Sequence, residues 1–505
     1  MSFCQARERL ILAGAVLTAA ALVAGCGNNY RPTITPVNST GPASTINTLV
    51  SVVSAPSRTV PGIVTILDYA GDSVMDYQPI GIGPTAYTVD TDSTYGYTIN
   101  SDHTLSEFQV TSTLQKNQIL VSTLPSTAQP LNLFSPSAGL WVPDLSDNTV
   151  DIFTGGPETY LSSVPVAPTP VMVIGPTSAG LRFFSISQGF AAPTGVECNA
   201  APASVAVNGE ADGIEPSSYT ISSHIPLGKC PVFAVESSDG RRLFVMNRGS
   251  DTITVINAQN DTLNSCVCPP TGCLNYSNQA YYCHPTLPLS TTAAGILNAG
   301  NPAGYPPIPI NGTAGMSAVA GPVYAEYNGL LDLLVVSNYD GSTISVIDVS
   351  LDEYGNDSPT FGTTYTIPVG KNPASVTVLA DGSRAYTANQ SDQTVSIVNL
   401  SSHTVEGTLT VTGHPRTVAS VQNSTQGKVY VASPDSPYLT IIRTDQDIVE
   451  ATQQVQGNIV DVRVSAQTGS GGNSNGNTRI PGYGQPCNLP GAGPVASITA
   501  CQALP

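Results

Sequence analysis

Closely spaced cysteines are the residues of this sequence best suited to do chemistry. Four of its ten cysteines lie between Cys266 and Cys283, in the segment CVCPPTGCLNYSNQAYYC. Thiolates this close can converge on a tetrahedral zinc ion, but zinc sites usually use paired C-x2-C units, which the spacing C-x-C-x4-C-x9-C lacks. A loop without a core of its own is stabilised by disulfides where the compartment is oxidising. We therefore expect disulfides here and no metal site.

The remaining cysteines fit the same interpretation once Cys4 and Cys26, near the N-terminus, are set aside. Cys198 with Cys230, and Cys487 with Cys501, are candidate local bridges. An even number of cysteines in an exported chain indicates disulfides, although the sequence leaves their connectivity open. The eight candidate disulfide cysteines are Cys198, Cys230, Cys266, Cys268, Cys273, Cys283, Cys487 and Cys501.

Catalytic groups are not evident among the other residues. The chain has five histidines, and His103, His403 and His414 fall where turns or connections between strands are expected. Aspartates such as Asp251 and Asp340 recur in similar turns, where short polar side chains accept backbone hydrogen bonds. The sequence contains no nucleophile elbow, P-loop or HExxH helix. It therefore nominates no catalytic residue, no metal ligand and no cofactor.

Four tyrosines make the cysteine-rich region a candidate partner-binding surface. Tyr276, Tyr281, Tyr282 and Tyr305 lie in or just after it. Tyrosine is amphipathic and common at protein interfaces. The alternative is that these rings pack the insertion onto the rest of the fold.

Composition limits the partners and the fold class. The chain carries 17 basic and 35 acidic residues, and the resulting net charge of −18 repels phosphate backbones. Only 10% of its residues are charged, while Gly, Pro, Ser, Thr and Val abound, which favours short strands and turns over helices. We expect an all-β protein that does not bind nucleic acid.

A repeated pattern shows how the strands are organised. Each copy has an apolar strand, a polar turn and a second strand that alternates Val, Ile and Thr, which is the pattern of a β-hairpin. The copies are YTINSDHTLSEFQV from Tyr97, WVPDLSDNTVDIFT from Trp141, FVMNRGSDTITVIN from Phe244, VVSNYDGSTISVID from Val335, YTANQSDQTVSIVN from Tyr386 and YVASPDSPYLTIIR from Tyr430.

A second block precedes several hairpins and completes a four-stranded unit. Examples are HIPLGKCPVFAVESSDGRRLFVMN and TIPVGKNPASVTVLADGSRAYTAN. Tyr97 and Trp141 are 44 residues apart, and Val335 and Tyr386 are 51 apart, close to the 40 to 50 residues of one propeller blade. The motifs FVMN, VVSN and YTAN, followed by TITVIN, TISVID and TVSIVN, resemble the YVTN-repeat family of bacterial β-propellers, while WVPD and YVAS depart from the pattern at the Asn.

This resemblance implies a propeller over residues 46–466 with an insertion at about 258–315. Two weaker units, at 62–81 and from 181 onward, bring the count of blades to eight, whereas such families usually have seven, so we expect seven or eight. The strand at 457–467 lacks a following hairpin and is expected to complete the sheet begun by the N-terminal segment, which closes the ring.

The N-terminus has the pattern of an export signal. Arg7 and Arg9 precede an apolar run that is too short to span a bilayer comfortably, and the run ends in VAGC at Cys26, which resembles the lipobox of bacterial lipoproteins. That resemblance implies cleavage of residues 1–25 and lipid chains, palmitate among them, on Cys26. Gly27 follows, with no Asp in the next position, which by the bacterial sorting rule favours the outer membrane.

The predicted organisation is a signal peptide (1–25), a lipid-anchored tether (26–45), the propeller (46–466) and a flexible linker with a cysteine-containing tail (467–505). We expect a binding or scaffold module in the cell envelope, facing the periplasm or the outside, whose partner is another protein or an envelope polymer. The alternative is a propeller enzyme, lactonase-like or cofactor-dependent, that uses the mouth of the central channel. Propeller folds host many activities, so the fold alone does not decide between them.

Overall fold

The computed structural model describes residues 49–465 with short internal gaps. The gaps are 70, 91–93, 111–119, 126–127, 137–138, 155–158, 176–181, 192–197, 199–201, 265–282, 300–315, 354 and 421–426. The predicted signal peptide, tether, linker and tail lie outside the described residues.

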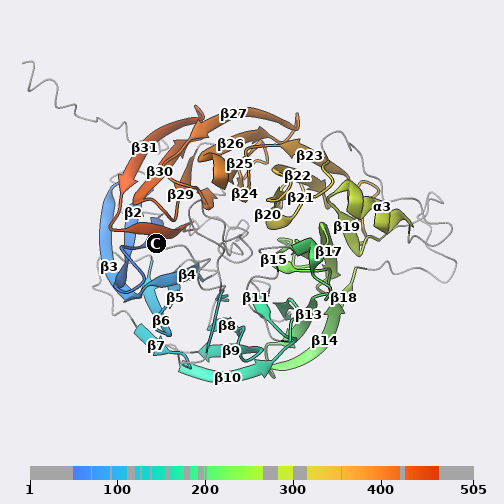
Figure 1. Ribbon diagram of the computed structural model, residues 1–505, viewed down its shortest axis with the longest axis horizontal. Coiled ribbons are helices and arrows are strands. Elements are labelled where there is room, and N and C mark those ends of the chain that lie inside the picture. Colours follow the sequence, from blue (N-terminus) through green and yellow to red (C-terminus); the bar gives the residue numbers. More distant parts are fainter. Residues whose placement is uncertain are drawn as a thin grey trace, which may run out of the picture.

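The described residues form eight antiparallel sheets, which are arranged as blades around a central axis (Figure 1). From the axis outward, blade 1 consists of β32 (Asn458–Val464), β1 (Leu49–Ala55), β2 (Pro61–Asp68) and β3 (Val74–Ile82), and blade 2 of β4 (Pro84–Val89), β5 (Tyr95–Asn100), β6 (Thr104–Gln109) and β7 (Leu120–Thr123). Blade 3 consists of β8 (Leu140–Asp144), β9 (Thr149–Thr154) and β10 (Thr159–Pro165). Blade 4 consists of β11 (Pro170–Ile174), β12 (Phe183–Ser187), β13 (Glu210–Glu215) and β14 (Thr220–Pro226).

Blades 5 to 8 follow the same order. Their strands are β15 (Pro231–Glu236), β16 (Arg242–Asn247), β17 (Thr252–Asn257) and β18 (Thr262–Leu263) with β19 (Thr286–Pro288); β20 (Pro322–Asn328), β21 (Leu333–Asn338), β22 (Thr343–Asp348) and β23 (Thr364–Pro368); β24 (Pro373–Val378), β25 (Arg384–Asn389), β26 (Thr394–Asn399) and β27 (Thr404–Thr410); and β28 (Thr417–Ser420), β29 (Lys428–Ala432), β30 (Tyr438–Arg443) and β31 (Ile448–Gln454). The described helices are α3 (Thr291–Ala299) and the 3-10 turns η1 (Pro202–Ser204) and η2 (Gln390–Asp392).

The ring is closed by strands from opposite ends of the chain. β32 is the innermost strand of blade 1 and pairs with β1, with Val52 opposite Val462. Figure 1 shows this orange-red strand beside the blue N-terminal blade. The pairing satisfies backbone groups that would be open edges in an unclosed array. The predicted β-propeller is confirmed, and it has eight blades.

A buried asparagine explains why the repeat has its particular sequence. In four blades an Asn ends the second strand, and its Nδ2 donates hydrogen bonds to two hydroxyls on the third strand. Asn389 Nδ2, for example, lies 3.0 Å from Thr394 Oγ1 and 2.8 Å from Ser396 Oγ. The equivalent residues are Asn100, Asn247 and Asn338. In blade 3 the corresponding strand is β8, whose inner neighbour is reduced to isolated bridges from Pro130 and Phe134. β8 ends in Asp144, which accepts hydrogen bonds from the Ser146 hydroxyl and the Gln129 backbone amide.

Residues in the turns between third and fourth strands connect neighbouring blades. Asp447, in blade 8, accepts hydrogen bonds from Arg384 and Tyr386 of β25 in blade 7. Asp72, in blade 1, pairs with Lys428 of β29 in blade 8 at 2.6 Å. Both aspartates have positive φ, a conformation that Asp adopts more readily than most residues. These turns therefore fasten the outer parts of adjacent blades together.

Two short strands within the predicted insertion belong to blade 5. β18 pairs with one end of β17 and β19 pairs with the other, so the two short strands share the place of one outer strand. Residues 265–282, which the chain places between β18 and β19, lie outside the described residues. Among the described residues, no helix combines the length and the apolar character needed to cross a membrane.

Candidate functional site

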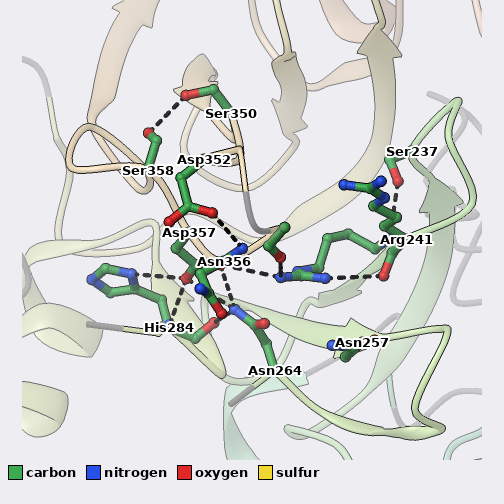
Figure 2. Close-up of polar contacts among 12 residues, drawn as sticks. Ser237, Arg241, Asn257, Asn264, His284, Ser350, Asp352, Asn356, Asp357 and Ser358 are labelled. Atoms are coloured by element: carbon green, nitrogen blue, oxygen red, sulfur yellow. Dashed lines mark hydrogen bonds and ion pairs between the residues drawn. The ribbon is translucent and has the colours of Figure 1, made fainter. Parts of the chain in front are cut away.

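The base of the cysteine-rich segment is held by one carboxylate from the next blade. Asn264 precedes residues 265–282 and His284 follows them, with Cys283 between. Asp357 comes from the excursion that joins β22 to β23 in blade 6. Figure 2 shows its carboxylate between Asn264 and His284. We call Asn264, His284 and Asp357 the clamp.

The contacts of the clamp are short and buried. Asn264 Nδ2 donates to both carboxylate oxygens of Asp357, each at 2.9 Å. The backbone nitrogen of His284 donates to Oδ2 at 2.8 Å, and its Nδ1 lies 3.3 Å from the same oxygen. The Asp357 side chain is fully buried. An ionised carboxylate with several donors is tolerated in the interior, and removal of the acceptor would leave those donors unpaired.

A buried arginine supplies the opposite charge. Arg242 begins β16, and its guanidinium lies 3.6 Å from Asp357 while donating at 2.8 Å to the Gly355 carbonyl. Burial lowers the pKa of Arg242, and the Asp357 carboxylate offsets part of that effect. The buried pair of Arg242 and Asp357 therefore joins blade 5 to blade 6, and the clamp joins the base of the segment to this pair.

Local contacts give the blade 6 excursion a defined shape. The Ser350 and Ser358 hydroxyls are 2.7 Å apart, and Asp352 accepts a hydrogen bond from the Asn356 amide at 2.9 Å (Figure 2). The His284 ring stacks on Phe361 with the ring centres 5.7 Å apart. These contacts fix Asp357 and hold the imidazole against the blade.

A second polar network lies where the turns of blades 5 to 7 meet blade 4. Arg248 makes a bidentate contact with Asp340, at 2.9 and 2.8 Å, and donates to the Cys198 carbonyl. Its guanidinium also lies over the Tyr339 ring, and the Tyr339 hydroxyl donates to Gln390. Arg248, Tyr339 and Gln390 each follow the buried Asn of their repeats. Their polar groups thus contact one another or the neighbouring Asp340 and Cys198.

A third network is buried between the inner strands of blades 8, 1 and 2. Arg463 of β32 lies 3.1 Å from Asp461 and donates at 3.1 Å to the Tyr87 carbonyl of β4. Arg416, which precedes β28, donates to the Val460 carbonyl. Burial raises the pKa of Asp461, and the two guanidinium groups oppose that shift. We interpret this network as structural, since it joins the blades where the ring closes.

The candidate bridge between Cys198 and Cys230 is present in the structure. Cys198 is bonded to Cys230, so the long turn between β12 and β13 is tied to the connection between β14 and β15. Cys283 is also disulfide-bonded. The other candidate cysteines, Cys266, Cys268, Cys273, Cys487 and Cys501, lie outside the described residues. So do Cys26 and the four candidate surface tyrosines, Tyr276, Tyr281, Tyr282 and Tyr305.

The three histidines and the aspartates predicted in turns or connections lie there. His103 lies between β5 and β6, His403 between β26 and β27, and His414 between β27 and β28. The Asp251 carboxylate accepts a hydrogen bond at 2.8 Å from the amide of Gly321, in the connection to the next blade. Sequence reasoning missed Asn264, Arg242 and Asp357, because nothing in their local pattern distinguishes them from ordinary strand and turn residues.

Comparison with known proteins supports the fold. No family model and no curated protein matches the chain. Among solved structures, AztD from Citrobacter koseri has a TM-score of 0.54 at 10% identity, covering 84% of this chain and 99% of that one. Its apo form has a TM-score of 0.52 at 10% identity, with 83% and 97% covered. The chain is an eight-bladed β-propeller.

A third solved structure that is similar to this chain is the dihydro-heme d1 dehydrogenase NirN in complex with DHE. Its TM-score is 0.52 at 12% identity, over 88% of this chain and 79% of that one. AztD and NirN are different proteins, and at 10% and 12% identity their likeness to this chain shows the fold alone. The function must be argued from the residues of this propeller.

Proposed function

We propose that this β-propeller is an exported lipoprotein, anchored through lipid on Cys26, that serves as a binding or scaffold module in the cell envelope. In this proposal residues 1–25 are a signal peptide and residues 26–45 a tether at the outer membrane. The ring presents the segment 265–282 to another protein or to an envelope polymer. The YVTN-like repeats and the lipobox-like VAGC are the sequence features that support it.

The clamp is the observation that carries the binding role. Burial of a charge such as that of Asp357 costs free energy. This buried carboxylate holds Asn264 and His284, which lie on either side of residues 265–282. Loops that carry function are typically positioned by a rigid scaffold. A segment fixed at both ends on the edge of a blade is suited to present contact residues such as Tyr276 and Tyr281.

The second polar network favours binding over catalysis at the ring's turns. Arg248, Asp340 and Tyr339 are groups that an enzyme could use, yet their polar atoms contact one another or neighbouring backbone. A catalytic acid or base must be within reach of a substrate proton. An enzyme that works at the channel mouth would have to break this network to use its members.

The segment can be tested directly. Residues 265–282 are replaced by a Gly/Ser linker of equal length together with Cys283→Ser, and Cys283→Ser alone is the control. Immobilised wild-type and control proteins are expected to retain the same envelope component, which the linker variant loses while its melting temperature stays that of the control. Equal retention by all three would overturn the role of the segment.

The anchor is tested separately by cell fractionation. Wild-type protein is expected in the membrane fraction, and Cys26→Ser is expected in the soluble envelope fraction because the lipid-bearing thiol is gone. A Cys26→Ser protein that stays with the membrane after residues 1–25 have been removed would contradict lipid anchoring, while the linker variant would still judge the binding role.

A further inference from the structure

Three side chains of types that can ligate a metal ion meet on the outer half of blade 4. Glu210 and Asp212 are two residues apart on β13 and so point to the same face, and His224 on β14 is paired directly with Asp212. His224 Nδ1 lies 2.9 Å from a Glu210 oxygen and 2.7 Å from an Asp212 oxygen. One potential ligand atom from each residue lies within 4.8 Å of the others.

The hydrogen-bond pattern of this triad is poorly satisfied without a cation. A single Nδ1 carries at most one hydrogen, yet it faces two carboxylates. The two carboxylates also face each other, and Asp212 is completely buried. A divalent ion between the three side chains would accept a lone pair from each of them at once.

Two buried hydroxyls point toward the same face without a hydrogen-bond partner. Ser185 is paired with Asp212, and Ser187 with Glu210, across β12 and β13, so their side chains lie on the triad's side of the sheet. Both residues are 0% exposed, and neither hydroxyl oxygen has a partner. Buried polar groups are nearly always hydrogen-bonded, so these two hydroxyls are available to bond a ligand on this face of the sheet.

The surroundings suit an ion that retains solvent. The second Asp212 oxygen accepts a hydrogen bond at 2.6 Å from the Ala167 amide, which orients the carboxylate as outer contacts orient metal ligands. The side chains of Glu210 and His224 are 39% and 68% exposed, so they can move apart and leave room for water. Ligands of tetrahedral zinc are about 3.3 Å apart at normal bond lengths, so the separations of His224 Nδ1 from the Glu210 and Asp212 oxygens need to grow by only about 0.5 Å.

We propose that Glu210, Asp212 and His224 bind a divalent transition-metal ion, with Zn²⁺ as the reference cation, and that Ser185 and Ser187 hydrogen-bond its water. One imidazole with two carboxylates favours such an ion over Ca²⁺, which takes oxygen ligands. The sequence predicted no metal site, because the triad exists only once β13 and β14 are in register. Binding must weaken as the pH falls, since the ligands bind the ion in their deprotonated forms.

The test is Zn²⁺ titration of the tag-free, oxidised protein by calorimetry, with Co²⁺ absorption spectra as a second readout. We expect one saturable ion per chain and proton release on binding. His224→Ala should abolish the site, and Ser185→Ala should weaken it by about 10-fold or more, as loss of an outer contact does. The matched control is His414→Ala, because His414 contacts a single carboxylate, that of Asp435.

The control is expected to bind Zn²⁺ as the wild type does, and His224→Ala should keep the wild-type melting temperature in the presence of a chelator. The proposal would be overturned by a wild type without saturable binding, or by a His224→Ala protein that binds Zn²⁺ and shifts the Co²⁺ spectrum unchanged. An effect of Ser185→Ala on folding alone, with the affinity unaltered, would remove the serines from the site.

Discussion

The Oδ2 atom of Asp357 accepts a hydrogen bond from the backbone nitrogen of His284 at 2.8 Å, although the residues are 73 positions apart in different blades. Asn264 reaches the same carboxylate from the other side of segment 265–282. The base of the segment is thus held at the junction of blades 5 and 6, where a single side chain contacts both of its ends.

Asp357→Ala should destabilise the propeller by about 3 to 5 kcal/mol. The variant leaves the buried Arg242 charge without its carboxylate and removes the acceptor for Asn264 and His284. Urea unfolding measures the loss, and limited proteolysis should show faster cleavage near 265–282. Asp445→Asn, in a surface ion pair with Arg443, is the control and should change stability by less than about 1 kcal/mol. Equal effects of the two variants would contradict the clamp.

Asn389→Ala should cost about 1 to 3 kcal/mol, because it removes both hydrogen bonds from Nδ2 to the hydroxyls of Thr394 and Ser396 inside blade 7. Chemical denaturation provides the measurement. Asn260, in an exposed turn, serves as the control, and its alanine variant should remain within about 0.5 kcal/mol of wild type. If Asn389→Ala were equally mild, the buried asparagine would not explain the repeat.

The repeat could be predicted from the sequence and the clamp could not, because the contacts of the repeat join residues close in the chain and those of the clamp join distant ones. Asn389, Thr394 and Ser396 lie within one hairpin, so their spacing is visible along the chain. Asp357 lies in the polar stretch DEYGNDSPT, which reads as an ordinary loop, and its partners are found only after blades 5 and 6 are assembled. The metal-site triad was equally hidden, since strand register brings His224 opposite Asp212.

Removal of the Cys198–Cys230 disulfide should lower stability by about 3 to 4 kcal/mol. The bond closes a loop with a sequence separation of 32 residues, and cross-links of that span restrict the unfolded chain by this amount in the chain-entropy model. The double variant Cys198→Ala, Cys230→Ala is compared with wild type by denaturation without reductant. An unchanged midpoint would show that the bond adds nothing to stability.

Glu236 should make the propeller less stable as the pH rises toward 8. Burial raises the pKa of Glu236 from 4.5 to about 8, so the folded chain keeps a proton that the unfolded chain has released between these values. Stability from this group is complete below about pH 4.5 and is lost as the pH rises through about 8.

Glu236→Gln should therefore flatten the dependence of unfolding free energy on pH, because the amide does not titrate. Urea denaturation at several pH values measures the slope, and Glu353→Gln, at an exposed position, should leave it unchanged. A Glu236→Gln profile as steep as that of the wild type would assign the slope to other groups.

The most direct test of the clamp as the support of a binding segment is the dissociation rate of the envelope component retained by the wild type, measured against Asp357→Asn. Asn keeps the size of Asp but presents an amide group to the donors of Asn264 and His284. At a temperature where both proteins are folded, we predict faster dissociation from Asp357→Asn and no change for Asp445→Asn. Identical dissociation from all three proteins would contradict the account.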